Sequence, residues 1–298
     1  MKEVLAEILE CKNRLSAVIM AHSYQPQEIQ DLADTVGDSL ELSRFARDAR
    51  APLVIFCGVR FMAETAKILS PETTVRLVAP GADCSLAACM NGADARLWKS
   101  EHPGAVLVTY VNSEADVKAE SWACCTSANA VAVVNAAPSP KVLFGPDRNL
   151  AEYAAENSRK QVIPWPGGCH AHSGADIRDL RRARAAWPDA AVLVHPETPP
   201  VFRREADRVL GTGGMISFVS QSSLGRFIIG TEEGMLNRLT SLFPDREFVS
   251  AGGITCPDMR KATPEMVLMA LKSHDTGVHV HPGLVAPARE ALERMAAL

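Results

Sequence analysis

Residues 17–39, AVIMAHSYQPQEIQDLADTVGDS, contain an apolar run, a polar triplet and a helical stretch that recur twice along the chain. The corresponding segments are residues 105–127, AVLVTYVNSEADVKAESWACCTS, and residues 191–212, AVLVHPETPPVFRREADRVLGT. An apolar run followed by a helical pattern predicts a strand, a loop and a helix. Self-similarity at one period indicates that the chain is built from three copies of one unit.

Two further landmarks recur in each copy. A second apolar run ends at a glycine before another helical pattern, and a third apolar segment leads to a cysteine. Strands that alternate with helices at this period predict an α/β fold of three similar parallel-sheet αβα units. We expect these units to be arranged around a pseudo-threefold axis. The glycines are Gly58, Gly145 and Gly230, and the cysteines are Cys84, Cys169 and Cys256.

The period also predicts the domain organisation. The first α/β repeat is expected at residues 1–80, the second at residues 81–165 and the third at residues 166–256. Residues 257–298 are expected to form a helical tail that could return to pack on the first repeat. In parallel α/β sheets, ligands bind at the carboxyl ends of the strands. The polar triplets and the three cysteines follow strands, so we expect them to face one centre.

The composition favours a globular protein that does not bind nucleic acid or span a membrane. The 298 residues are 47% hydrophobic and 22% charged, which is typical of a globular protein with a sizeable core. A formal net charge of −4 provides no general attraction to nucleic acid or to an anionic membrane, so small-molecule partners are expected. The first residues lack the apolar core of a signal peptide, and no apolar run is long enough to span a membrane. The sequence therefore predicts a cytoplasmic protein.

The three recurring cysteines predict a metal centre. Converging thiolates repel one another unless a cation neutralises them, and soft thiolates select zinc, copper(I) or iron-sulfur clusters. Structural zinc sites usually show C-x2-C pairs, and the sequence contains none. A [4Fe-4S] cluster normally takes four cysteines, so three would leave one iron free to act as a Lewis acid in a dehydration. We therefore favour a [4Fe-4S] cluster held by Cys84, Cys169 and Cys256.

The other five cysteines do not share this pattern. Buried free cysteine is common without any chemical role, and we expect this of the four cysteines with no place in the repeat. Cys89 follows Cys84 closely but has no counterpart in the other copies, so its role stays open. The four cysteines expected to be inert are Cys11, Cys57, Cys124 and Cys125.

The triplets offer groups for proton transfer and binding. Histidine, tyrosine and a buried glutamate can transfer protons near neutral pH, which makes His22, Tyr24, His195 and Glu197 candidates. The second triplet offers Tyr110 and Asn112, whose neutral hydrogen bonds suit a carboxylate.

A hydroxyl residue follows each triplet at the same spacing, just before a new helical pattern. We interpret these residues, Ser39, Ser127 and Thr212, as helix N-caps. Three helix N-termini that meet would bind phosphate or carboxylate groups. His172 lies in the segment C169-HAH172 and is expected close to the cluster.

With these residues in place, the chain closely resembles the quinolinate synthase family over nearly its full length. The motifs that carry the resemblance are AHSYQPQEIQDLADTVGDSLELSR, GVRFMAETAKILSPE, TYVNSEADVKAES, CTSANAV, FGPDRNL, the GC-x-x-H pattern at Cys169, VHPE and IIGTEEGM. The resemblance implies three α/β domains around a central [4Fe-4S] cluster. It also implies condensation of iminoaspartate with dihydroxyacetone phosphate to quinolinate, phosphate and water, in NAD biosynthesis.

The resemblance further implies roles for individual residues. Cys84, Cys169 and Cys256 match the cluster ligands, His22 and Tyr24 a catalytic pair, and Glu197 an acid/base carboxylate. The iminoaspartate would come from L-aspartate oxidase or aspartate dehydrogenase. This chain has Gly211 where the family usually has a serine, so one phosphate contact is lost or made by the backbone. The remaining matches are substrate contacts, at Ser39, Tyr110, Asn112, Ser127, His172, His195 and Thr212.

Three other functions remain open at this point. An iron-sulfur hydro-lyase acting on another hydroxy acid would also carry the cluster, but it would form no quinolinate. An iron-sulfur sensor would need an effector surface or a basic recognition helix, and the sequence shows no such helix. A zinc-stabilised binding protein would be colourless and would lack iron.

Overall fold

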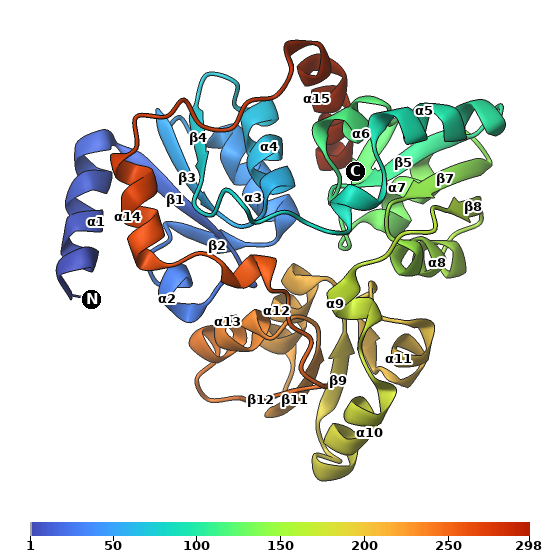
Figure 1. Cartoon of the computed structure of the whole chain (residues 1–298). Helices are drawn as coiled ribbons and strands as arrows, with labels where there is room; N and C mark the ends of the chain where they lie inside the picture. Colours follow the sequence, from blue (N-terminus) through green and yellow to red (C-terminus); the bar gives the residue numbers. More distant parts are fainter. Residues whose placement is uncertain (1) are drawn as a thin grey trace.

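The computed structural model describes residues 2–298 and contains three four-stranded sheets, one for each recurring segment. The strand orders are β2-β1-β3-β4, β6-β5-β7-β8 and β10-β9-β11-β12, and all pairings are parallel. Because all three sheets share one strand order and carry flanking helices, the prediction of three similar α/β units is confirmed. Figure 1 shows the units, in blue, green and orange, around a common centre.

The strands lie where the apolar runs predicted them. The first run of each copy forms β1 (Ala17–His22), β5 (Val106–Tyr110) and β9 (Ala191–Val194). These strands are inside their sheets and almost entirely buried, which explains why they are continuous apolar runs. The runs that end at glycine or lead to cysteine form β3 (Leu53–Cys57), β4 (Thr74–Leu77), β7 (Lys141–Gly145), β8 (Gln161–Pro164), β11 (Arg226–Gly230) and β12 (Glu247–Ser250).

Each sheet also has a short edge strand that the sequence patterns did not predict. These are β2 (Thr35–Gly37), β6 (Ala123–Cys125) and β10 (Arg208–Val209), which pair with β1, β5 and β9. A strand of two or three residues is too short to show an alternating pattern. Each edge strand ends just before one of the recurring hydroxyl residues.

Helices connect the strands and cover both faces of the sheets. In the first unit, α1 (Lys2–Leu15) and α14 (Pro264–Lys272) cover one face, where Ile8 and Leu271 join a buried cluster with Ile19 and Ile55. The connecting helices are α2 (Gln27–Gln30), α3 (Ser39–Asp48), α4 (Arg60–Leu69), α5 (Gly92–Glu101), α6 (Ala115–Ala119), α7 (Ala130–Ala136), α8 (Arg148–Glu156), α9 (His170–Ser173), α10 (Ile177–Ala186), α11 (Pro200–Glu205), α12 (Thr212–Gln221) and α13 (Gly234–Leu242).

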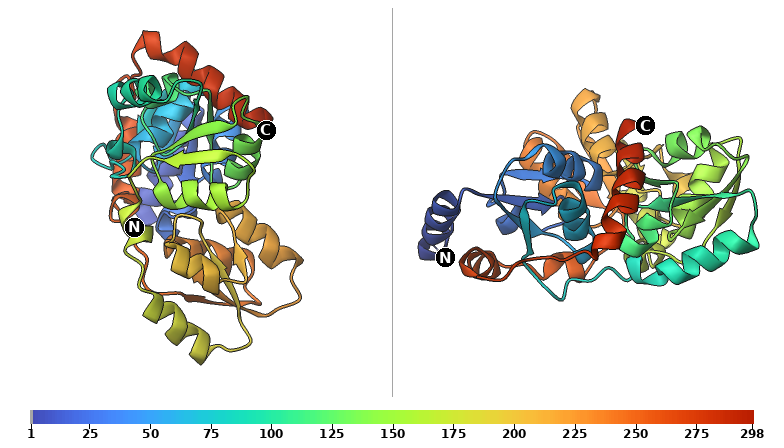
Figure 2. Two further views of the ribbon diagram at one scale, coloured as in Figure 1. Left: turned by 90° about the vertical axis from the view of Figure 1, so that its right-hand side faces the viewer. Right: turned by 90° about the horizontal axis from the view of Figure 1, so that it is seen from above.

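The C-terminal segment connects the units. After Cys256 the chain returns to the first unit as α14, and α15 (Pro282–Ala297) then packs against α4, α6 and β6. Figure 2 shows α15, in red, between the blue and green units. We propose domain boundaries near residues 80 and 165, with the tail shared between the first two units. Within residues 2–298, no helix is both long and apolar enough to cross a membrane.

Candidate active site

Two neighbouring cavities lie where the carboxyl ends of the central strands meet. The first, here called the polar pocket, has a volume of about 40 Å³. The second, the cysteine pocket, has a volume of about 50 Å³, and both are lined by Tyr24, Asn112, Glu197 and Met259. The remaining lining residues of the polar pocket are His22, Asp38, Ser39, Met62, Tyr110, Thr126, Ser127, His195 and Thr212. Residues from all three units therefore form one composite site.

The cysteine pocket gathers Cys84, Cys169 and Cys256, each of which follows the last strand of a different sheet. Cys84 follows β4, Cys169 directly precedes α9, and Cys256 follows β12. Burial raises the pKa of Cys84 to about 12 and raises the pKa values of Cys169 and Cys256 as well. Because burial disfavours free thiolates here, a positively charged group would be needed to hold them.

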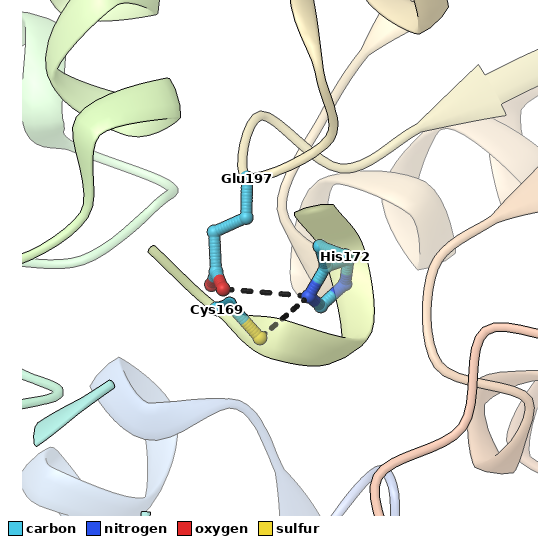
Figure 3. Close-up of side chains that lie close together, drawn as sticks. All are labelled: Cys169, His172 and Glu197. Atoms are coloured by element: carbon cyan, nitrogen blue, oxygen red, sulfur yellow. Dashed lines mark hydrogen bonds and ion pairs between the residues drawn. The ribbon is translucent and has the colours of Figure 1, made fainter. Parts of the chain in front are cut away.

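His172 and Glu197 lie beside Cys169 (Figure 3). Nδ1 of His172 is 3.3 Å from Sγ of Cys169 and 3.3 Å from Oε2 of Glu197. The three residues each offer a ligand atom, all within 4.8 Å of one another, so they could hold a metal ion. In the described part of the chain, this is the only set of three or more such ligands so closely spaced.

The three cysteines are not spaced as ligands of one tetrahedral ion. Thiolates around one tetrahedral zinc ion, at a Zn–S distance of about 2.3 Å, lie about 3.8 Å from one another. Over residues 2–298, the close ligand set contains only one cysteine, so the three cysteine sulfurs are not all within 4.8 Å of each other. In a [4Fe-4S] cluster each thiolate binds a separate iron atom, which requires wider spacing. Three thiol donors that line one cavity are a donor set that a [4Fe-4S] cluster could use.

Backbone contacts orient the two predicted histidines at the strand ends in the same way. The N–H of Tyr24 donates to Nδ1 of His22 at 3.2 Å, and the N–H of Glu197 donates to Nδ1 of His195 at 3.3 Å. Burial lowers the pKa of His22 to about 4 and that of His195 to about 3, although the charge of Glu197 opposes the shift. Both imidazoles are therefore neutral at pH 7 and carry their proton on Nε2.

Glu197 is a buried carboxylate that lines both pockets. It is 3% exposed, and it accepts a 2.6 Å hydrogen bond from the hydroxyl of Tyr110. Burial opposes its ionisation, but the contacts with His172 and Tyr110 outweigh burial and lower its pKa. Burial and the charge of Glu197 raise the pKa values of Tyr24 and Tyr110 well above 10, so both phenols remain hydrogen-bond donors.

Comparison with known proteins agrees with this geometry. The family model described as quinolinate synthetase A protein matches residues 6–297. The chain belongs to the quinolinate synthase family. A quinolinate synthase of Methanoregula boonei is 45% identical over 293 residues, covering 98% of this chain and 97% of the relative. A quinolinate synthase of Dehalococcoides mccartyi is 45% identical, covering 97% and 96%. That of Desulforudis audaxviator is 44% identical, covering 99% and 98%.

In this member of the quinolinate synthase family, all the predicted catalytic, substrate-binding and cluster-binding residues line one of the two pockets. His172 and the three cysteines line the cysteine pocket, and the other predicted residues line the polar pocket. Oδ1 of Asn112 is buried with no hydrogen-bond partner in the described chain, although its residue lines both pockets. An unpaired buried carbonyl oxygen at this position is available to a ligand.

The interpretation of the three hydroxyl residues as helix N-caps was wrong. Asp38 caps α3 by accepting from the N–H groups of Leu40 and Glu41, which leaves Ser39 in the first turn. The residues at the cap positions of α7 and α12 are Asn129 and Gly211, and neither cap involves a side-chain hydrogen bond. An aspartate, an asparagine or a glycine near the hydroxyl residue takes the cap position instead.

These three helix starts nevertheless converge at the polar pocket. A Cβ atom at Gly211 would lie 2.6 Å from Oγ of Ser127, and one at Gly213 would lie 2.9 Å from Oδ2 of Asp38. Glycine thus allows the third unit to approach both other units closely. Ser39, Ser127 and Thr212 are not used as side-chain caps, so their hydroxyls can contact a ligand in the pocket.

Two carboxylates beside the cysteines were not predicted from the sequence. Asp147 accepts hydrogen bonds from the N–H groups of Leu150 and Cys169, at 2.7 and 3.0 Å. Glu232 accepts from the N–H of Cys256 at 3.1 Å. Each lies two positions after the recurring glycine of its unit, Gly145 or Gly230, so closer comparison of the repeats could have identified them.

Replacing Asp147 with alanine is expected to lower the free energy of unfolding by about 2 kcal/mol or more. The side chain is fully buried, and its loss would leave two N–H groups without acceptors. Urea unfolding followed by circular dichroism measures the change. Asp189→Ala, at an exposed position, is the matched control and should change stability by less than about 0.5 kcal/mol. Equal stability of the two variants would contradict a structural role for the Asp147 carboxylate.

Proposed function

We propose that this protein is a quinolinate synthase that condenses iminoaspartate with dihydroxyacetone phosphate to quinolinate, phosphate and water. The reaction would supply NAD biosynthesis in the cytoplasm, with iminoaspartate delivered by an L-aspartate oxidase or aspartate dehydrogenase. The observation that carries this proposal is the composite site. Three cysteines, each following the last strand of a different sheet, line a cavity that adjoins a polar pocket through Tyr24, Asn112 and Glu197.

Cys84, Cys169 and Cys256 would hold the [4Fe-4S] cluster. When bound, the cluster would supply a Lewis-acidic iron with a free coordination position, a suitable partner for a departing hydroxyl group. The walls beside the thiols include Val59, Phe61 and Met259, which would limit the access of water. Limited solvent access strengthens electrostatic contacts in such a site.

The polar pocket would bind the anionic groups of the substrates without a basic side chain. None of its lining residues is lysine or arginine. Neutral donors remain: the Nε2–H groups of His22 and His195, and the hydroxyls of Ser39, Ser127 and Thr212. Three separate units supply these donors, so a phosphate or carboxylate would be held at the centre of the molecule. The side-chain amide N–H groups of Asn112 would donate to a second carboxylate, and the hydroxyl of Tyr110 would do so in place of its bond to Glu197.

Glu197 and Tyr24 would move protons during condensation and dehydration. Glu197 is an ionised acceptor that lines both pockets, and Tyr24 is a protonated donor that also lines both. A proton acceptor and a proton donor of the protein that contact the same substrate can assist imine formation, tautomerisation and loss of phosphate. His22 lies edge-on to the Tyr24 ring, with centroids 4.6 Å apart, and would fix the position of that ring.

The test is anaerobic purification, with iron and sulfide counting and an assay of quinolinate from the two named substrates. We expect brown protein with about four iron and four sulfide atoms per chain that forms quinolinate. Brown protein without quinolinate formation would favour a hydro-lyase for another hydroxy acid. Colourless, zinc-containing protein would show instead that the site with Cys169, His172 and Glu197 holds a single ion.

A further inference from the structure

Each polar triplet is followed, eight positions after its first residue, by a residue with a long polar side chain that is almost completely buried. These residues belong to corresponding helices, α2, α6 and α11, and are at most 6% exposed. Residues of this kind are mostly exposed in proteins and are seldom buried without a partner. The three residues are Gln30, Lys118 and Arg203.

All three side chains make the same contact. Each donates a hydrogen bond to the carbonyl oxygen of the residue that directly follows its triplet. This carbonyl lies beyond the end of the central strand, and a buried carbonyl needs a donor. The donor and acceptor pairs are Nε2 of Gln30 with the oxygen of Gln25 at 2.9 Å, Nη1 of Arg203 with that of Thr198 at 2.9 Å, and Nζ of Lys118 with that of Ser113.

Each side chain also contacts the helix between the last two strands of a neighbouring unit. The first unit contacts the third in this way, the second contacts the first, and the third contacts the second. The contacts therefore follow one rotational order around the centre of the molecule. They are Nε2 of Gln30 with the carbonyl oxygen of Gly234 at 3.4 Å, Nζ of Lys118 with the ring centroid of Phe61 at 5.3 Å, and Nη2 of Arg203 with Oε1 of Glu156 at 3.2 Å.

The chemistry of the three residues indicates positioning rather than proton transfer. Glutamine does not titrate and arginine keeps its charge, so neither can exchange a proton in a reaction. The three residues share an N–H donor at the end of a long side chain. In the second and third units, the residue after the triplet also donates its hydroxyl to the carbonyl oxygen of the first triplet residue. These bonds join Ser113 to Tyr110 at 3.0 Å and Thr198 to His195 at 2.6 Å.

We propose that Gln30, Lys118 and Arg203 are positioning residues, one in each unit, whose buried N–H donors hold the triplet loops at the composite site. This inference rests on the proposed function, because these loops carry the residues assigned to proton transfer and carboxylate binding. Tyr24 and Glu197 directly precede two of the carbonyl acceptors in the chain. A shift of such a loop by about 1 Å would misplace its reacting group and could cost about 10²-fold in rate.

Arg203 gives the sharpest test, because the second unit offers a replacement with the same kind of donor. Arg203→Lys keeps a donor and the charge, whereas Arg203→Met keeps a long side chain without a donor. In iron-loaded protein, we expect kcat of Arg203→Met to fall by about 10- to 100-fold at unchanged KM, since misplaced reacting groups lose rate rather than binding. Arg203→Lys should stay within about threefold of wild type. Equal losses in the two variants, or full activity of both, would overturn the proposal.

Glu156→Ala separates the contact with the loop from the ion pair between the units. The side chain of Glu156 is 56% exposed, and exposed ion pairs contribute little to stability. This variant should keep kcat within about threefold of wild type. A loss as large as that of Arg203→Met would assign the effect to the ion pair and contradict the proposal.

Lys118→Met tests the second loop, whose Tyr110 and Asn112 are assigned to carboxylate binding. We expect KM for iminoaspartate to rise by about tenfold while kcat stays within about threefold of wild type. A purely structural defect would lower the amount of folded, iron-loaded protein and leave KM unchanged, so an unchanged KM would refute this role of Lys118. Lys160→Met is the matched control and should keep wild-type kinetics. Nζ of Lys160 also donates to a carbonyl oxygen, that of Ala137 at 2.7 Å, but Lys160 lines neither pocket.

Gln30→Met provides the same comparison in the first unit if a variant of a charged residue does not fold, because methionine is close in size to glutamine. Its kcat should fall by about tenfold through displacement of Tyr24, and an unchanged kcat would contradict the proposal. Wild-type protein that forms no quinolinate would refute the proposed function itself. Active wild type together with unaffected variants would refute only this inference.

Discussion

We expect each of the variants Cys84→Ser, Cys169→Ser and Cys256→Ser to lose its iron and nearly all quinolinate formation. Each of Cys84, Cys169 and Cys256 follows the last strand of a different sheet, so none of them can replace a lost neighbour. A serine hydroxyl is a harder and far less acidic ligand than a thiol and binds iron weakly. Loss of Lewis-acid assistance worth about 4 kcal/mol would lower the rate about 10³-fold. Iron and sulfide content, together with the anaerobic assay, measures both effects.

Cys89→Ser provides the matched control for these variants. Cys89 lies close to Cys84 in the sequence, but it is exposed and lines neither pocket. This variant should keep its full iron content and activity. A Cys84, Cys169 or Cys256 variant that keeps both would remove that residue from the proposed ligand set. Loss of iron from Cys89→Ser would instead show that the ligand set had been assigned incorrectly.

Glu197→Gln is expected to lower kcat by about 10²- to 10⁴-fold without loss of iron. Glutamine has nearly the same shape, but it cannot accept a proton at neutral pH. Its amide would also disturb the contacts with Tyr110 and His172, because one carboxylate oxygen becomes a donor. Steady-state kinetics on protein of known iron content measures the loss, and kcat should fall more than KM rises.

A control variant and the iron content test whether the loss of activity comes from proton transfer at Glu197. Glu247→Gln changes an exposed glutamate at the start of β12, away from the carboxyl ends of the strands, and should leave kcat unchanged. Iron content separates proton transfer from metal binding, because Glu197 also belongs to the close set with Cys169 and His172. If Glu197→Gln loses its iron as the cysteine variants do, Glu197 is a metal ligand and the acid/base assignment is wrong.

The sequence predicted the strands, their repetition and the residues at their ends for a physical reason. Strands buried on both faces must be apolar throughout, so β1, β5 and β9 are visible as runs that stop where the polar triplets begin. Parallel strands present their carboxyl ends at one edge, which places His22, Tyr110 and His195 at corresponding positions. The same period located one cysteine after the last strand of each sheet.

Local competition for backbone groups caused the errors at the helix starts. A hydroxyl before a helical pattern predicts an N-cap, but Asp38 precedes Ser39 and takes that position with its carboxylate. The edge strands β2, β6 and β10 were missed because their pairing depends on the neighbouring strand rather than on their own few residues.

By itself, the sequence determined the three-unit α/β architecture, the family and the set of residues that meet at the centre, because those features repeat at a regular spacing. Only the tertiary structure decided which of those side chains touch. The bond between Tyr24 and Thr231 joins residues 207 positions apart, and Asp147 reaches Cys169 across two strand ends. Such contacts depend on how the three sheets pack against one another, and local sequence patterns do not determine that packing.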